Sequence, residues 1–317
     1  MNPEISVIVP TFNRASTLDR TLNGFTGLDL HDLTAEFIVV NNNSSDQTQS
    51  VLERYRNRLP LTPLFEPTPG KNHALNRALS HGPGGSIVVF TDDDVDVDPQ
   101  WLRSIHSVSS RWPNYSVFGG RIEVLWPDVQ RPGWCTSRYV REFGFAEHSY
   151  AASETEYRVG NFPFGPNYWV RAEVLKNCRF DVEVGPHPTN RILGDETLFL
   201  AKLAKSGYTA LYSPTPCVHH RIEAGVMTVD GILKRAAQLG RGIPHLRGFP
   251  REIEFKKRYP IWLLRRYLAL WMYRQKILLA SLKRTTDEEV LRQIGLHRDL
   301  GMNSEAIRLG RQLRSPE

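Results

Sequence analysis

Five carboxylates fall within seven residues, directly after the apolar run 87–90: Asp92, Asp93, Asp94, Asp96 and Asp98. Carboxylates this close repel one another unless protons or a cation offset their charge. Hard divalent ions such as Mg²⁺ and Mn²⁺ prefer oxygen ligands and commonly bind together with substrate phosphates. The cluster therefore predicts a metal–phosphate site, with a solvated acidic turn as the alternative.

The residues around this cluster predict where it lies in a fold. Residues 87–90 read Ile-Val-Val-Phe and follow Gly84-Gly85, which is typical of a buried strand in a mostly parallel sheet. Asp98-Pro99 then marks the start of a helix. Because ligands of open α/β sheets bind at the carboxyl ends of the strands, the aspartates are predicted to occupy a ligand-binding edge.

Strands and helices alternate through the first 115 residues, which predicts a doubly wound α/β fold. The expected strands are 5–9, 36–40, 61–65 and 87–90, and the expected helices are 16–25, 47–58 and 72–79. Further elements are expected at 116–120, 121–125, 168–175, 196–206 and 209–212. Residues 126–164 lack periodicity and predict a long functional loop, able to order over substrate.

Composition bounds the class of protein. The 317 residues are 40% apolar and 23% charged, as in soluble globular proteins. The three cysteines (Cys135, Cys178 and Cys217) are odd in number and lack paired spacing, which argues against a disulfide framework or a zinc site. Neither a signal peptide nor an apolar stretch of membrane-spanning length is apparent, so a cytoplasmic location is expected.

Charge is divided unevenly along the chain. Residues 1–230 hold 21 Lys and Arg against 26 Asp and Glu, whereas residues 231–317 hold 19 against 8. Within the basic part, 259–284 predicts a helix with an apolar stripe. This helix either packs on the rest of the protein or on a second copy in a homodimer, or it lies on the anionic inner face of a membrane. No nucleic-acid-binding motif is present, so no nucleic-acid partner is expected.

Seven motifs, taken in order, resemble family-two glycosyltransferases of the GT-A fold. They are found at 7–14 (VIVPTFNR), 39–46 (VVNNNSSD), 70–76 (GKNHALN), 90–94 (FTDDD) with 99–102, 165–175, 194–196 and 218–221. The resemblance covers roughly residues 4–225 and implies a Rossmann-like, mostly parallel central sheet flanked by helices. It also implies a GT-A catalytic domain over 1–225, followed by a basic helical extension over 226–317. Within the domain, 1–115 would bind the nucleotide sugar and 116–225 the acceptor.

The resemblance implies a donor site for a nucleotide-diphosphate sugar, with a UDP-sugar expected. The implied binding residues are Pro10, Thr11, Asn13, Arg14, Asn41, Asn42, Lys71, Asp92 and Asp93. Lys71 would act beside the phosphates. Asn41 and Asn42 stand where relatives often have Asp in contact with the nucleobase, so the identity of the nucleobase is left open. An Asn-rich turn can hydrogen-bond a ribose or a base, but it also forms without any ligand.

A metal and a base complete the implied site. Asp94 corresponds to the direct ligand of Mn²⁺ or Mg²⁺, and Asp92 to a contact with ribose or sugar. His220 corresponds to a histidine that completes the metal shell in some relatives, although a histidine at a strand end is also a common structural residue. The family usually has Glu then Asp at the base motif, and this order is reversed in Asp195-Glu196. We take Asp195 as the first candidate for the base and Glu196 as the second, with helix N-terminal charge as the structural alternative.

The implied reaction is sugar transfer with inversion to a hydroxyl group of a glycan, a lipid-linked acceptor or a small molecule. One alternative is a nucleotidyltransferase, although the turn Pro10–Arg14 lacks the glycines expected there. The other is a catalytically silent subunit that binds a nucleotide sugar without turning it over.

Overall fold

The computed structural model describes residues 3–247, 268, 271–272, 275 and 286–312, so the expected helix over 259–284 lies largely outside the described residues. The described chain forms two compact units. The sheet unit comprises the described part of Met1–Pro127 together with Phe145–Asn190 and Asp195–Ile222. The helical unit comprises Asp128–Gly144, Arg191–Gly194 and the described part of Glu223–Glu317.

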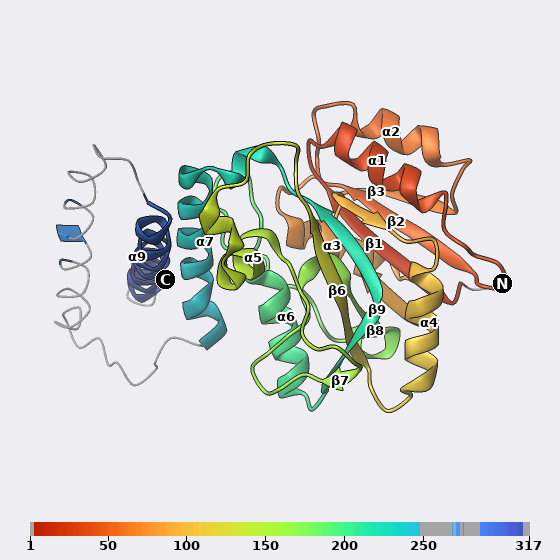
Figure 1. Cartoon of the computed structure of the whole chain (residues 1–317). Coiled ribbons are helices and arrows are strands. Elements are labelled where there is room, and N and C mark those ends of the chain that lie inside the picture. Colours follow the sequence, from red (N-terminus) through yellow and green to blue (C-terminus); the bar gives the residue numbers. More distant parts are fainter. Residues whose placement is uncertain (1–2, 248–267, 269–270, 273–274, 276–285, 313–317) are drawn as a thin grey trace. The chain divides into compact units, whose positions relative to one another are not determined.

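The sheet unit is built on a mixed sheet with the strand order β3-β2-β1-β4-β8-β6-β9-β5, and β7 pairs with β9 (Figure 1). The strands are β1 Ile5–Thr11, β2 Ala35–Asn41, β3 Leu61–Phe65, β4 Ile87–Phe90, β5 Val95–Val97, β6 Val117–Leu125, β7 Thr155–Glu156, β8 Tyr168–Arg171 and β9 Ala210–Arg221. β1 pairs in parallel with both β2 and β4. The carboxyl ends of these three strands therefore share one edge of the sheet.

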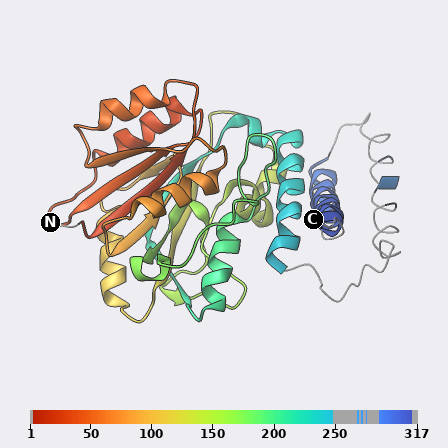
Figure 2. The same cartoon turned by 180° about the vertical axis from the view of Figure 1, so that it is seen from behind.

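Helices cover both faces of this sheet (Figures 1 and 2). They are α1 Ala15–Phe25, α2 Thr48–Tyr55, α3 Lys71–His81, α4 Trp101–Arg111 and α6 Asp195–Lys205, with short 3₁₀ helices η2 Gly165–Asn167 and η3 Ala172–Leu175. Alternate residues of β1 face opposite ways, since Val7 and Val9 pack with residues of α1, α2 and α4, whereas Ile8 packs with α3 and α6. Burial on both sides explains why β1 and β2 consist mainly of apolar residues.

The structure confirms the four strands and three helices expected in the first 90 residues, with bounds that differ by at most three residues. It differs further along. The two strands expected over 116–125 are one strand, β6, with an irregular register between Gly120 and Arg121. β9 continues to Arg221 instead of ending near residue 212, and the loop over 126–164 contains α5 Arg138–Phe145 and a 3₁₀ turn, η1 Gly133–Thr136.

The helical unit contains η4 Ala224–Met227, α7 Val229–Arg247 and α9 Asp287–Gln312. Glycines let α7 and α9 approach closely, because a Cβ on Gly240 would lie 1.8 Å from the Arg298 carbonyl oxygen.

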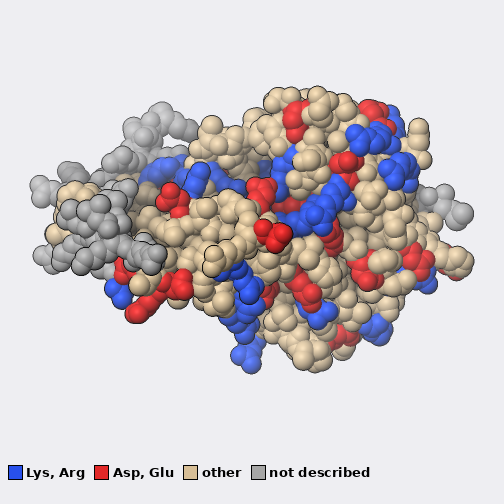
Figure 3. All heavy atoms as spheres, turned by 45° about the horizontal axis from the view of Figure 1, so that its top comes forward, with Lys and Arg blue, Asp and Glu red and all other residues tan. Residues whose placement is uncertain are grey.

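None of the helices among the described residues combines the length and apolar composition that a membrane crossing requires. Basic and acidic side chains are interspersed over the described atoms of the face shown in Figure 3.

Candidate functional site

The turn after β1 contacts the aspartates after β4. Thr11 Oγ1 donates a hydrogen bond of 2.7 Å to Asp93 Oδ2. Arg14 Nη1 lies 2.8 Å from Asp93 Oδ1 and 2.9 Å from Asp94 Oδ2. Because β1 and β4 are parallel neighbours, residues 82 positions apart in sequence meet at the sheet edge.

The two buried carboxyl groups, Asp93 and Asp94, have different protonation tendencies. Burial raises the pKa of Asp93 to about 7, with Arg14 opposing this shift and Asp94 adding to it. Burial would also raise the pKa of Asp94, but His220 and Arg14 outweigh it and hold that pKa well below its usual range. Asp94 therefore ionises at a lower pH than Asp93.

Asp94 and His220 form an acceptor pair suited to a cation. His220 Nε2 lies 3.3 Å from Asp94 Oδ1, and that oxygen is buried without a hydrogen-bond partner. His220 Nδ1 lies 2.7 Å from the Phe145 carbonyl oxygen, so Nδ1 is the donor to it and Nε2 faces Asp94. Burial alone would lower the pKa of His220, but the Asp94 charge raises it. Either a proton or a metal ion between these atoms would satisfy both, so the residues fit a divalent ion.

Arg221 holds the aspartate turn in place and was given no role by the sequence analysis. Its guanidinium donates to the carbonyl oxygens of Val95 (2.8 Å) and Thr17 (2.9 Å) and to Thr21 Oγ1 (2.6 Å), and it pairs with Asp96. Arg221 directly follows His220 at the end of β9, and this position could have indicated its role from the sequence.

Lys71 bridges two carboxylates from different parts of the chain. Its Nζ lies 2.7 Å from Asp92 Oδ1 and 2.6 Å from Glu196 Oε1. Burial would lower the pKa of Lys71, but Asp92 and Glu196 raise it well above its ordinary value. Lys71 is thus a permanent cation that connects the turn after β4 to the start of α6.

Asp195 and Glu196 differ as acids although they are adjacent. Burial and the neighbouring Glu196 charge raise the pKa of Asp195 well above its ordinary value, and Asp195 Oδ2 is buried without a hydrogen-bond partner. Burial would raise the pKa of Glu196 as well, but Lys71 outweighs it and holds the value at about 2. The Glu196 side chain is 18% exposed, whereas Asp195 is 3% exposed. Glu196 is therefore the ionised and more accessible carboxyl group.

Two glycines make room for these carboxyl groups. A Cβ on Gly165 would lie 2.5 Å from Glu196 Oε1, so a larger residue at this position would displace the Glu196 carboxylate. Gly185 has φ of +120°, and a Cβ there would lie 3.3 Å from Asp195 Oδ2. The Tyr168 hydroxyl is buried without a hydrogen-bond partner, and burial and the Glu196 charge raise its pKa. Sequence analysis missed Tyr168, which follows the Gly-Pro-Asn motif directly.

The asparagines at the ends of β1 and β2 form hydrogen bonds to neighbouring loops of the protein. Asn42 Nδ2 donates to the carbonyl oxygens of Thr68 (2.7 Å) and Glu66 (3.2 Å), and Asn42 Oδ1 accepts the Gly70 N–H at 2.7 Å. These bonds secure the loop that leads into Lys71.

Neighbouring positions shape the same region. Asn41 Oδ1 accepts the Ser44 N–H at 2.9 Å, and Asn13 Oδ1 accepts the Ser45 N–H at 2.7 Å. Pro10 is a buried residue of β1, opposite Val40. The turns that the sequence assigned to a nucleotide are therefore joined to each other by their own hydrogen bonds.

The mixed sheet, its flanking helices and the acidic edge after β4 define a GT-A domain. Residues 6–143 match the model of glycosyl transferase family 2, so this part of the chain is similar to that family. Glycosyltransferase AglE of Haloferax volcanii is 25% identical over 213 residues, which are 67% of this chain and 64% of that protein. A GalNAc(5)-diNAcBac-PP-undecaprenol beta-1,3-glucosyltransferase of Campylobacter jejuni is 36% identical over 99 residues, or 29% of this chain and 30% of that enzyme. The aligned part of the chain thus spans less than two thirds of each of these relatives.

Solved structures share the fold. The mannosyltransferase PcManGT of Pyrobaculum calidifontis, in complex with GDP-Man and Mn²⁺, has a TM-score of 0.56 at 22% identity, covering 100% of this chain and 77% of that one. S. aureus TarS 1-349, in complex with UDP-GlcNAc, has a TM-score of 0.50 at 18% identity, covering 97% and 92%. At these identities the likeness establishes the GT-A fold.

Proposed function

We propose that this protein transfers a sugar from a nucleoside-diphosphate sugar to an acceptor hydroxyl group, with inversion at the anomeric carbon and with a divalent metal. The observation that carries the proposal is the arrangement of five titratable side chains at the site. Asp94 with His220 fits a metal ion, and Lys71 joins the donor-side Asp92 to the ionised Glu196. The relatives named above are glycosyltransferases, which supports the same activity here.

Asp94 and His220 would hold Mn²⁺ or Mg²⁺. When bound, the ion would offset the negative charge that grows on the departing diphosphate. The PcManGT complex contains Mn²⁺ and GDP-Man, which supports a metal-dependent donor site. Asp93 would keep Arg14 and Thr11 oriented toward the nucleotide through its hydrogen bonds to both.

Glu196 is the residue we assign as the general base, which reverses the order of preference expected from sequence. Its carboxylate would accept the proton of the acceptor hydroxyl group as that oxygen attacks the anomeric carbon. The bond from this carbon to the diphosphate oxygen breaks, and the nucleoside diphosphate leaves. Asp195, with its raised pKa, would remain protonated beside Glu196 and would help to position the Glu196 side chain.

The acceptor we propose is a glycan or a lipid-linked sugar. The name of the Campylobacter relative describes an undecaprenol-linked acceptor, which supports a lipid-linked one here. Such an acceptor would place this protein at the inner face of the membrane in the cytoplasm, with the segment 259–284 as its contact. Most of that segment lies outside the described residues, and a homodimer through it is the competing proposal.

The decisive experiment is thermal unfolding of the full chain with UDP, GDP, CDP or dTDP, each with and without Mn²⁺. We expect one nucleotide to raise the Tm only when Mn²⁺ is present, because a ligand that binds the native state stabilises it. Asp94→Ala should abolish this increase, and Asp98→Ala, a change in the same acidic run, should keep it.

The same protein is then tested for turnover with the matching nucleotide sugar. Release of the nucleoside diphosphate supports the proposal. Binding without release would support the silent subunit, and absence of any Tm increase in folded protein would overturn the donor site.

A further inference from the structure

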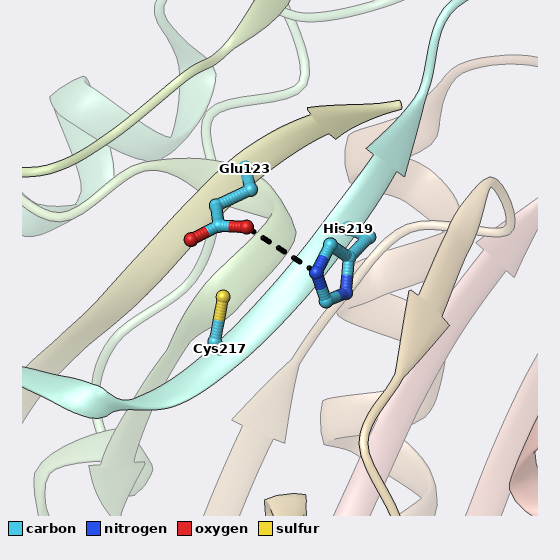
Figure 4. A group of neighbouring side chains, drawn as sticks. All are labelled: Glu123, Cys217 and His219. Carbon is cyan, nitrogen blue, oxygen red and sulfur yellow. Dashed lines mark ion pairs between the residues drawn. The ribbon is translucent and has the colours of Figure 1, made fainter. Parts of the chain in front are cut away.

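A second cluster of metal-binding side chains lies on the sheet, apart from the aspartates after β4. Figure 4 shows Glu123 of β6 with Cys217 and His219 of β9, their side chains directed toward one another. One carboxylate oxygen, the thiol sulfur and one imidazole nitrogen all lie within 4.8 Å of one another.

Strand pairing brings these residues together. β6 and β9 pair in parallel, with Glu123 opposite His219 and Arg121 opposite Cys217. Because side chains alternate along a strand, Cys217 and His219 project from one side of β9, and Glu123 meets them from β6. The irregular register after Gly120 fixes this pairing, since a shift of one residue would turn the side chains to the other face.

His219 and His220 serve different clusters for the same reason. His219 Nε2 lies 3.3 Å from Glu123 Oε2, whereas His220 Nε2 lies 3.3 Å from Asp94. Adjacent residues of a strand point to opposite sides, so the two histidines face different groups. The cluster of Glu123, Cys217 and His219 is therefore a separate site.

Arg121 is the competing partner in this cluster. It pairs with Cys217 across the two strands, and its Nε lies 3.4 Å from Glu123 Oε1. That Nε is nevertheless buried without a hydrogen-bond partner, so this pairing leaves a donor unsatisfied. The Arg121 side chain is 41% exposed and can turn into solvent when a cation takes its place.

We propose that Glu123, Cys217 and His219 form a Zn²⁺ site with water as the fourth ligand. Sulfur, imidazole nitrogen and carboxylate oxygen are the ligands that zinc takes in proteins, and thiolate is a poor ligand for Mg²⁺ and Mn²⁺. Tetrahedral bonds to zinc place the ligand atoms about 3.3–3.8 Å apart, so the cluster reaches that geometry with side-chain shifts of about 1 Å.

Paired cysteine spacing could not reveal such a site. The ligands of this site come from two strands, and Glu123 and Cys217 are 94 positions apart in the sequence. The site also contains a single cysteine. Bound zinc would connect β6 to β9 just beyond the register irregularity.

Cobalt substitution in the full chain tests the proposal, under reducing conditions. Co²⁺ bound to a thiolate gives a ligand-to-metal charge-transfer absorption that oxygen-only sites lack. We expect this band in the unmodified protein, its loss on addition of equimolar Zn²⁺, and its absence in Cys217→Ser. Cys178→Ser is the matched control, because this partly buried cysteine of the same unit lies outside the cluster and should leave the band unchanged.

Ligand variants separate this site from the donor site. Glu123→Gln and His219→Gln alter partly exposed side chains, and each should weaken Zn²⁺ affinity at least tenfold in a competition with a chelating dye. Asp94→Ala should keep both the band and the affinity. A band that persists in Cys217→Ser, the lack of any band, or Zn²⁺ affinity unaffected by both Gln variants would overturn the proposal.

Discussion

At the scale of single residues, the acid–base asymmetry of Asp195 and Glu196 has a direct test. Glu196→Gln removes the ionised carboxylate, and we expect kcat to fall by about 10²–10⁴-fold with nucleotide binding kept. Asp195→Asn resembles the protonated form that its raised pKa favours, so it should lose much less activity. Steady-state kinetics with the donor identified by thermal unfolding would measure both. The reverse ranking of the two variants would assign the base to Asp195.

Lys71 sets the pH range over which Glu196 stays ionised. With Lys71 present, the pKa of Glu196 is about 2, so the carboxylate persists at every working pH. Removing a neighbouring cation destabilises a carboxylate and raises its pKa, so in Lys71→Met the acidic limb of kcat/KM should move up by about 1–3 pH units. Lys71→Arg keeps the charge and should keep the limb low. A pH profile of Lys71→Met that matches the unmodified enzyme would contradict this role.

The chemistry-bearing residues were visible in the sequence, but their pairings were not. Asp94 and His220 were named as metal ligands from their motifs, and the structure brings them to 3.3 Å of each other. The bridge from Lys71 to Glu196 joins positions 125 apart, and no local pattern reports such a contact. Its consequence, opposite pKa shifts for two adjacent carboxyl groups, depends on burial that only the folded chain defines.

At the scale of elements, Asn42 secures the loop before α3. Asn42→Asp keeps an acceptor for the Gly70 N–H but loses the donor to Thr68 and Glu66, and it places a carboxylate beside their carbonyl oxygens. We expect a loss of about 1–3 kcal/mol in the free energy of unfolding, measured by urea titration. Asn43→Asp is the control, because the exposed Asn43 amide makes a single bond of 3.2 Å to the Pro67 carbonyl oxygen. Equal losses in the two variants would contradict the assignment.

The contact of α7 with α9 depends on a buried carboxylate. Glu305 is 1% exposed and pairs with Arg241 (3.0 Å), His245 (3.0 Å) and Arg308 (2.6 Å). Burial would raise the pKa of Glu305, but its hydrogen bonds to Arg308, His245 and Arg241 lower it. A lowered carboxyl pKa stabilises the fold above the unfolded-state value of about 4.3, and this contribution is lost as pH falls through the folded-state pKa.

Glu305→Gln should therefore cost about 1–3 kcal/mol of unfolding free energy at pH 7 and less at pH 3. Urea titrations at the two pH values measure the difference, with Glu288→Gln, a change at a largely exposed side chain of α9, as the control. A cost that does not depend on pH would contradict a role for the Glu305 charge.

Element types followed from local patterns better than element ends did. Apolar runs identified the first four strands, since the central strands β1, β2 and β4 are buried along nearly their whole length. The range predicted for β9 ended too early, because Pro214 and Pro216 interrupt the pattern that a strand should show. In the fold these prolines lie where β9 skips its pairing with β6, between the pairs Gly120–Ser213 and Arg121–Cys217, so the strand resumes and delivers both histidines.

At the scale of the whole molecule, the two units are interleaved along the chain, so a cut at a single point does not separate them. Segments 128–144 and 191–194 belong to the helical unit although they fall within the first 225 residues. Arg235 Nε donates to the Phe143 carbonyl oxygen (3.1 Å), and the Leu193 N–H donates to the Gln238 carbonyl oxygen (3.1 Å). Ile232 is fully buried in the same unit, and its Cδ1 would lie 2.7 Å from a Cβ on Gly144.

A fragment ending at residue 222 should therefore be less stable than the full chain, because 128–144 and 191–194 would lose the helices they pack on. We expect a lower Tm or aggregation of the fragment, measured by scanning calorimetry. Ile232→Asp in the full chain should reproduce part of the loss, about 3 kcal/mol, since it buries an unpaired charge. Leu291→Asp, at a residue 37% exposed on α9, should change the Tm little. A soluble fragment with the Tm of the full chain would show that the sheet unit folds independently and that the C-terminal helices serve a purpose other than stability.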